Sequence, residues 1–204
     1  MDVSPIYFFY DDHSSDTMVV NENNRISTTN WIFHIDKRLP LRTVIPEVIR
    51  FQEKRKKASL HKNESARNYF SVNDTVTKSL GFIDFTQQIY LRDSLFSKFY
   101  IKERPDQHMS YFNVTVNYKL GDSITVDGNT IERNELESFL KEYIDFSAEG
   151  KSALVYLNFD QRLDFQTFLT NTLMMERLKN NNINISETIF IYDKTLLPDC
   201  NCSL

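Results

Sequence analysis

The residues best placed to do chemistry are an aspartate and an arginine that recur in a short pattern, Asp-x-Arg-Leu, at 36–39 and again at 160–163. Side chains two residues apart on extended backbone point to the same side, so each aspartate can pair with its arginine. Such a pair could serve an active site, but an aspartate just before a helix also stabilises the helix N-terminus by capping or by charge. We therefore interpret four motif residues as structural: Asp36, Arg38, Asp160 and Arg162.

The similarity between the two segments extends beyond the motif. Leu39 and Thr43 match Leu163 and Thr167 without a gap, and apolar positions coincide on both sides of the aspartate. In each copy, apolar residues alternate up to the aspartate and then follow helical spacing, which indicates a strand that runs into a helix. An internal duplication would explain the match. Chance similarity between two strand-to-helix junctions would explain it equally well, because the match is short.

Other residue types that form active or metal sites lack the necessary spacing. The four histidines are not spaced as metal ligands, and the one metal-compatible cluster, at residues 11–13, is too short to fill a coordination shell. Cys200 and Cys202 are separated by one residue, which is the wrong spacing for a zinc site. The four glycines are too dispersed for a phosphate-binding loop, and no nucleophile signature is present. The sequence therefore predicts no catalytic residue, no metal site and no cofactor.

Composition argues against nucleic-acid binding and membrane insertion. The net charge is -4, whereas phosphate neutralisation needs clustered lysine and arginine. The one basic run, at 54–57, ends a predicted helix, where cations complement the helix dipole. No run approaches the roughly 20 apolar residues that cross a bilayer. The apolar stretch at 6–10 is too short for a signal peptide and lacks its basic start. We expect a chain that neither spans a membrane nor carries an export signal.

Hydrophobic periodicity predicts an α+β protein. In the first half it indicates strands at 5–10, 18–20 and 31–36 and helices at 41–57 and 85–100, with a polar, flexible connection at 57–77 and a turn around Pro105. In the second half it indicates a strand at 112–120, a hairpin at 124–131, a helix beginning near Leu136, a strand at 154–159, a helix at 164–179 and a strand at 188–192. The last three elements form a βαβ unit with parallel terminal strands. We predict a mixed sheet with helices mainly on one face, divided into halves at 1–105 and 106–204.

Residues 122–193 resemble the soluble domain of the ExbD/TolR family of biopolymer-transport proteins. Residues 124–131 read Ile-Thr-Val-Asp-Gly-Asn-Thr-Ile, which is similar to that family's strand and turn, and residues 134–140 read Asn-Glu-Leu-Glu-Ser-Phe-Leu, which is similar to the following helix. Residues 160–165, Asp-Gln-Arg-Leu-Asp-Phe, match the family's second strand-to-helix junction.

The resemblance implies the fold of that soluble domain and binding to a partner protein. Two features depart from the family: the chain has no N-terminal transmembrane helix with an acidic residue, and the linker at 180–184 is rich in asparagine where the family usually has glycine. Proton-driven energy transduction is therefore not carried over. The resemblance implies a periplasmic location if the chain is a fragment, and otherwise we expect a cytoplasmic one. If the first half is a diverged copy of the second, the chain is a single-chain counterpart of a dimer; a homodimer is the alternative.

The leading functional hypothesis is a non-catalytic adaptor or scaffold that binds a protein or peptide, such as a component of a membrane transport complex. The predicted strand at 112–120 has one apolar face and one wet face, and its length would template pairing with a partner's strand. The predicted partner-binding residues lie on the wet face: Asn113, Thr115 and Asn117. The aromatic residues at 8–10, at Trp31 and on the predicted helix at 85–100 fill the core or form a partner-binding patch. The alternatives to an adaptor are an enzyme with a dispersed site and a structural protein with no ligand.

Overall fold

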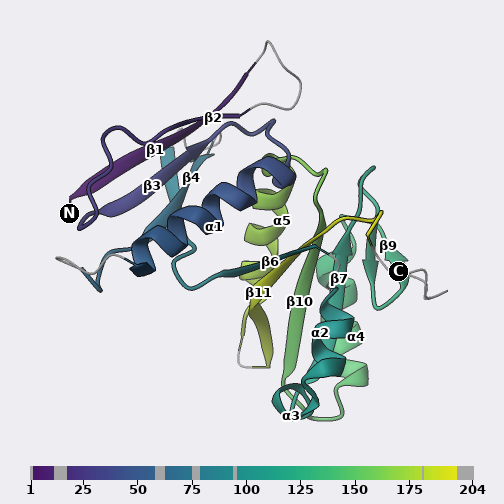
Figure 1. Cartoon of the computed structure of the whole chain (residues 1–204). Helices are drawn as coiled ribbons and strands as arrows, with labels where there is room; N and C mark the ends of the chain where they lie inside the picture. The colour runs from purple at the N-terminus through teal and green to yellow at the C-terminus, as the bar shows by residue number, and fades with distance from the viewer. Residues whose placement is uncertain are drawn as a thin grey trace. The chain divides into compact units, whose positions relative to one another are not determined.

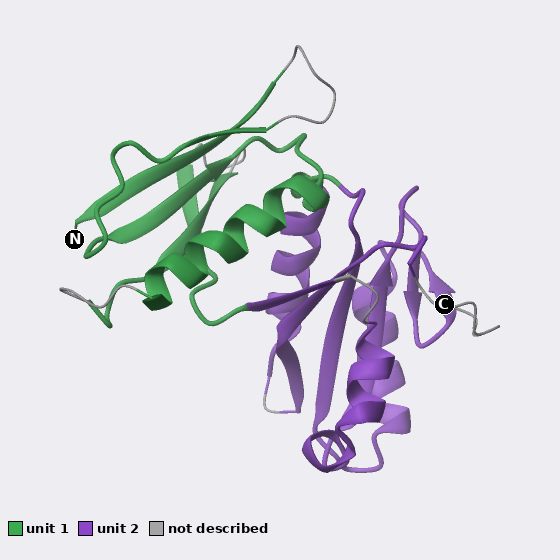
Figure 2. Ribbon diagram, in the orientation of Figure 1, with its two compact units in different colours: residues 1–88, 164–166 green, residues 89–163, 167–204 purple. Residues whose placement is uncertain are grey.

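A computed structural model describes residues 2–11, 18–57, 63–74, 79–93, 96–180 and 182–196 (Figure 1). The chain divides into two compact units (Figure 2). Unit 1 consists of residues 1–88 and 164–166, and unit 2 consists of residues 89–163 and 167–204. This boundary lies earlier in the chain than the predicted division at residues 105 and 106. The reason is that the strand at 89–93 pairs within the second sheet, and the short helix at 97–103 belongs to the same unit as that sheet.

Unit 1 is built on a five-stranded sheet with the order β2-β1-β3-β4-β5. Its elements are β1 (Val3–Tyr10), β2 (Met18–Asn21), β3 (Asn30–Ile35), α1 (Leu41–Lys57), β4 (Asn68–Asp74) and β5 (Ser79–Asp84). The central strand β3 runs parallel to β1 and β4, whereas the edge strands β2 and β5 are antiparallel to their neighbours.

Helix α1 covers one face of this sheet. Its apolar residues recur at helical spacing, so Val44, Val48 and Phe51 lie on one side and are fully buried. Phe51 contacts Phe8 and Phe33 of the two neighbouring parallel strands, with ring centroids 6.1 and 5.4 Å away. Aromatic edge-to-face contacts of this kind add to the free energy gained from burial. The aromatic residues that line this face of the sheet are therefore core.

Unit 2 is built on a six-stranded sheet with the order β6-β11-β10-β7-β8-β9. Its elements are β6 (Ile89–Asp93), α2 (Ser97–Glu103), α3 (Pro105–His108), β7 (Phe112–Tyr118), β8 (Ile124–Val126), β9 (Asn129–Ile131), α4 (Leu136–Ser147), β10 (Ala153–Asp160), α5 (Phe165–Leu178) and β11 (Ile183–Tyr192). Strands β7, β10, β11 and β6 are parallel, and β8 and β9 are antiparallel. The α+β class and the C-terminal βαβ unit, β10-α5-β11, are confirmed.

The two faces of the second sheet are covered by helices of different length. Phe168 of α5 packs on Phe159 of β10, and Tyr143 of α4 contacts Phe112 of β7 on the same face. The opposite face of β10 carries Asn158, whose side chain bonds to Ser97 of the short helix α2. Two long helices therefore cover one face, and two short ones cover the other.

Two predictions for residues 57–100 are wrong. The polar stretch at 57–77 was predicted to be a connection, but β4 lies within it and pairs with both β3 and β5. The predicted helix at 85–100 is instead β6 followed by the short helix α2. Ile89 and Phe96 have helical spacing, but residues 89–93 extend alongside β11. Pairing with a strand far along the chain overrode the local pattern.

The two units repeat the same central arrangement of strands. In unit 1, β1 pairs antiparallel with β2 and parallel with β3, and β3 continues through α1 to the parallel strand β4. In unit 2, β7, β8, β10, α5 and β11 follow the same order and directions. This agreement supports the hypothesis of internal duplication, because a chance match of four residues does not require matching topology around it.

Candidate functional site

The first Asp-x-Arg-Leu motif forms a closed local ring of hydrogen bonds at the end of β3. Asp36 Oδ1 accepts from the backbone N–H and the Nε of Arg38, both at 3.0 Å, and Oδ2 accepts from Nη2 at 2.8 Å. These bonds to Arg38 hold the pKa of the Asp36 carboxyl below its ordinary value. The aspartate caps the turn rather than the first turn of α1, and the guanidinium lies over the ring of Tyr10 at 4.5 Å.

The second motif has the same geometry in unit 2. Asp160 Oδ1 accepts from the backbone N–H and the Nε of Arg162, both at 2.9 Å, and Oδ2 accepts from Nη2 at 2.7 Å. The hydrogen bond to Asp160 raises the pKa of Arg162. In both motifs both carboxylate oxygens are bound by the arginine, so neither aspartate is placed to act as a general base. The interpretation of these pairs as structural is supported by this geometry.

A cavity of about 390 Å³ lies beside the second motif. Its lining residues come from the carboxyl ends of three parallel strands and the segments that follow them: Lys119, Leu120, Ser123, Asp160, Arg162, Tyr192 and Lys194. This end of a parallel sheet is where open α/β proteins commonly bind ligands. Burial, with the charges of Lys194 and Lys98, lowers the pKa of Lys119, and burial raises that of Tyr192.

The predicted partner-binding residues of β7 do not lie on an exposed edge. Strand β7 has β10 on one side and β8 on the other. Thr115 and Asn117 are 3% and 0% exposed, and Asn113 is half-buried, with its side-chain amide donating to the His108 carbonyl at 2.9 Å. The prediction of a wet face was wrong because α2 and α3, which the sequence pattern did not reveal, cover that face. Asn117 instead donates to Thr125 Oγ1 within the buried layer at 3.1 Å.

Histidines and cysteines do not assemble into a site in the described part of the chain. His34 stacks on Tyr7, and burial lowers its pKa. His108 is buried, and its Nδ1 lies 2.6 Å from the Tyr156 hydroxyl. Within the described residues, no three histidine, cysteine or carboxylate side chains gather as metal ligands. His13, His61, Cys200 and Cys202 lie outside the described residues.

The face of the five-stranded sheet opposite α1 carries a patch of exposed apolar side chains, here called the apolar patch. Its members alternate along their strands with less exposed residues, and their exposed fractions run from 36% to 53%: Val3, Tyr7, Phe9, Val19, Leu80 and Phe82. The register connects them across the sheet. Phe9 lies opposite Val19, and a row formed by Pro5, Ile32 and Tyr69 leads from β1 to Phe82 of β5. Large exposed apolar patches commonly mark interaction surfaces.

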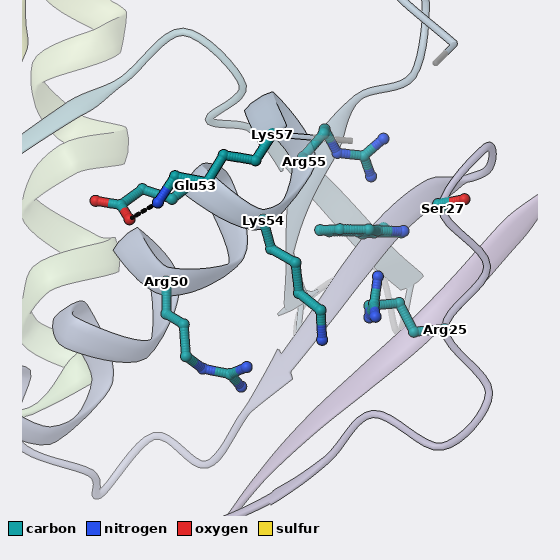
Figure 3. A pocket seen from close by; sticks show the side chains of 8 residues that line it. Arg25, Ser27, Arg50, Glu53, Lys54, Arg55 and Lys57 are labelled. Atoms are coloured by element: carbon teal, nitrogen blue, oxygen red, sulfur yellow. Dashed lines mark hydrogen bonds and ion pairs between the residues drawn. The ribbon is translucent and has the colours of Figure 1, made fainter. Parts of the chain in front are cut away.

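A second feature of unit 1 is a strongly basic cavity of about 510 Å³, here called the basic pocket (Figure 3). Helix α1, the loop after β2 and the start of β3 supply its lining: Arg25, Ser27, Trp31, Arg50, Glu53, Lys54, Arg55 and Lys57. Figure 3 shows Arg50 and Lys54 from the helix and Arg25 from the loop extending into the same space, while Lys57 turns aside to Glu53. The basic run at 54–57 was interpreted from the sequence as complementing the helix dipole. The sequence pattern did not indicate that Arg25 and Trp31 lie across the pocket from this run.

Comparison with known proteins gives no match: no family model, no curated protein and no solved structure is similar to this chain. None of the helices within the described residues is long and apolar enough to cross a membrane.

Proposed function

We propose that the protein is a non-catalytic binding module that takes up an extended peptide segment of a partner protein along the outer edge of β5. The observation that carries this proposal is the apolar patch, which reaches that edge through Leu80 and Phe82, 53% and 50% exposed. An exposed edge with apolar side chains is a site that proteins usually protect, because it templates pairing with another chain.

The backbone of β5 has the geometry for strand addition. The Phe85 N–H donates to the Asn68 carbonyl at 3.0 Å, which fixes the alternation of the antiparallel ladder with β4. By this alternation the backbone groups of Gly81 face β4, and those of Leu80 and Phe82 face outward. No described strand pairs with that outer side. Strand β5 is also six residues long, the longest described edge strand of either sheet.

The side chains beside this edge would supply selectivity. In peptide recognition by strand addition, main-chain hydrogen bonds supply affinity and alternate side chains supply specificity. Phe82 contacts Tyr69 of β4, with ring centroids 6.3 Å apart, so the two rings form an apolar surface next to the β5 edge. We therefore expect the bound segment to carry apolar residues at alternate positions on the side of the patch.

The resemblance of residues 122–193 to the ExbD/TolR soluble domain gives this proposal a context. The order of hairpin, helix, strand, helix and strand on which the resemblance rests is present in unit 2. In the context that it implies, the partner would be a component of a membrane transport complex, and the binding edge would belong to the unit that the resemblance does not cover.

The test is selection of linear peptides on the purified full chain, followed by affinity measurement by fluorescence anisotropy. We expect enriched peptides with alternating apolar residues, and we expect Phe82→Lys to weaken their binding by about tenfold or more, because a charge replaces an apolar contact at the edge. The matched control is Phe146→Lys, which alters a residue of α4 that is 90% exposed.

Two results would contradict the proposal. One is a selection that enriches no peptide. The other is a set of peptides that bind both variants equally well, since the β5 edge would then not be their site.

A second candidate function follows from the cavity beside Asp160. If the protein is an enzyme with a dispersed site, this cavity is where polar groups with shifted pKa values converge. Saturating the chain with small metabolite mixtures while following Lys119 and Lys194 by NMR would reveal such a ligand. Perturbation of both side chains by one compound would favour the ligand-binding alternative.

A further inference from the structure

We infer that the basic pocket of unit 1 binds the phosphate monoester group of a small phosphorylated ligand. This inference concerns a different surface from the apolar patch and does not depend on the proposed peptide binding. It rests on the charge balance of the pocket, on the arrangement of its two central arginines and on one arginine whose donors lack partners.

The pocket holds more positive than negative charge. Five cations line it, and three carboxylates pair with them: Glu22, Glu47 and Glu53. Glu22 alone serves three of the cations, accepting from Arg25 at 2.8 Å, Lys54 at 3.0 Å and Arg50 at 3.2 Å. Burial raises the pKa of Glu22, but the hydrogen bonds from Lys54, Arg25 and Arg50 outweigh burial and lower it to about 2. The remaining charge of two matches a phosphate monoester, which carries about -1.5 to -2 at neutral pH.

Two guanidinium groups are held in place by the one tryptophan of the chain. The guanidinium carbon of Arg55 lies 3.8 Å from the centre of the Trp31 ring, and that of Arg25 lies 5.0 Å from it. Trp31 itself is 1% exposed and is anchored by a 2.8 Å hydrogen bond from its indole N–H to the Ile26 carbonyl. Stacking fixes the planes of the guanidinium groups, so their donors are pre-organised for a planar or tetrahedral oxyanion.

Arg55 is the residue that most needs an anion. Its Nη2 donates to the Thr29 carbonyl at 3.1 Å, whereas its buried Nε and Nη1 have no hydrogen-bond partner among the described residues. Burial and then the charge of Arg25 lower its pKa to about 10. Two like charges over one ring and two unsatisfied donors cost free energy in the free protein. A bound phosphate would offset the repulsion between the two guanidinium groups.

The size and openness of the pocket fit a small molecule. A volume of about 510 Å³ lies within the range of ligand-binding pockets. Guanidinium groups form paired hydrogen bonds with phosphate oxygens, while the Lys54 ammonium acts as a point charge and the Ser27 hydroxyl can donate as well. A nucleic acid offers phosphodiesters with a single charge each, and these match the charge of the pocket less well than a monoester does.

The experiment uses the fluorescence of Trp31, which reports on this pocket alone because the chain has one tryptophan. Glycerol phosphate is titrated into the full chain at low ionic strength, with sulfate, acetate and a single-stranded oligonucleotide without terminal phosphate as comparison ligands. We expect a saturable fluorescence change with glycerol phosphate, and binding weaker than this by about tenfold for acetate, because acetate carries half the charge.

Three variants locate the site. Arg55→Lys keeps the charge but loses the planar donors, and we expect it to weaken binding by about tenfold. Lys54→Ala should weaken binding by a smaller factor and leaves the tryptophan clamp untouched, so it tests the site even if Arg55→Lys folds poorly. Arg133→Gln removes an arginine that pairs with Asp122 in unit 2 and should leave binding unchanged.

The inference would be overturned by any of three results: no saturable change with glycerol phosphate, equal binding by wild type and both pocket variants, or tighter binding of the oligonucleotide than of glycerol phosphate. Thermal-shift measurements on the same variants provide a second readout, since a ligand bound only by the folded chain raises its melting temperature.

Discussion

Each unit contains a strand-to-helix junction with the same motif. The units differ in how the second face of each sheet is covered. In unit 1, α1 covers one face of the sheet, and the apolar side chains of the patch are exposed on the other face. In unit 2 the short helices α2 and α3 cover the second face, and the polar residues there bond to one another and to the helices. The difference shows that exposure cannot be read from alternation along a strand alone: the apolar alternate face is exposed in unit 1, and the polar one is buried in unit 2.

The junctions themselves differ in burial although their bonds are the same. The side chain of Asp36 is 25% exposed, and that of Asp160 is 2% exposed. Their arginine partners are similarly exposed, at 54% and 45%. The same motif therefore stabilises a partly solvated turn in one unit and a buried carboxylate in the other.

The largest effects are expected at matched core positions of the two central strands. Phe33→Ala should destabilise unit 1 by about 4 kcal/mol and Leu157→Ala should destabilise unit 2 by about 3 kcal/mol, because both are buried and both leave cavities. Urea titration followed by Trp31 fluorescence reports on unit 1, and circular dichroism reports on the whole chain. If each variant shifts the fluorescence and circular dichroism transitions equally, the two units unfold together in one transition. Their stabilities then cannot be compared separately.

The next effect separates the two junctions. Asp160→Ala leaves the Arg162 guanidinium and a backbone N–H without their buried acceptor and should cost about 3 kcal/mol, whereas Asp36→Ala should cost about 1 kcal/mol because water replaces the carboxylate. Urea titration of the two variants measures the difference. Equal losses of unfolding free energy in the two variants would show that burial of the aspartate does not change its contribution to stability.

A smaller effect concerns acid stability and should be confined to unit 1. The pKa of Glu22 is lowered from 4.5 to about 2 in the folded chain, so its ion pairs stabilise the protein fully above pH 4.5. That contribution is lost as the pH falls from 4.5 toward 2, because the unfolded state binds the proton first. Glu22→Gln should flatten this part of the pH profile of Trp31-detected unfolding. If the pH dependence of unfolding is the same in Glu22→Gln as in the wild type, the loss of stability in acid does not come from Glu22.

The smallest effect on stability is expected at the apolar patch. Phe82→Lys and Phe146→Lys both alter exposed side chains and should change the free energy of unfolding by less than about 0.5 kcal/mol. Calorimetry of both variants provides the measurement. A large loss in Phe82→Lys alone would mean that the Phe82 ring supports the sheet, and its effect on peptide binding could then not be assigned to the edge.

Sequence reasoning succeeded where local pattern and tertiary structure agree. Helix α1 spans the predicted residues 41–57, and the Asp127-Gly128 turn joins β8 to β9 as predicted, with positive φ at both residues. The reasoning failed where long-range pairing decides the conformation, as for β6 beside β11. Neither of the two proposed binding surfaces in unit 1 could be predicted from the sequence. Trp31 and Arg25 lie beside α1 only in the folded chain, and the edge at Phe82 exists only once β4 has paired with β5.

The make-up of unit 1 has a consequence for biosynthesis. Residues 164–166 belong to unit 1, where the backbone N–H of Phe165 donates to the Leu39 carbonyl at 2.9 Å and that of Gln166 to the Lys37 carbonyl at 3.1 Å. A ribosome that adds about 5 to 20 residues per second makes these partners several seconds after residue 88. Until the second motif has been translated, the Lys37 and Leu39 carbonyls of the first motif therefore lack these two backbone partners and are bonded by water instead. All residues of the first copy have therefore been made before synthesis reaches β11, the last strand of the second copy.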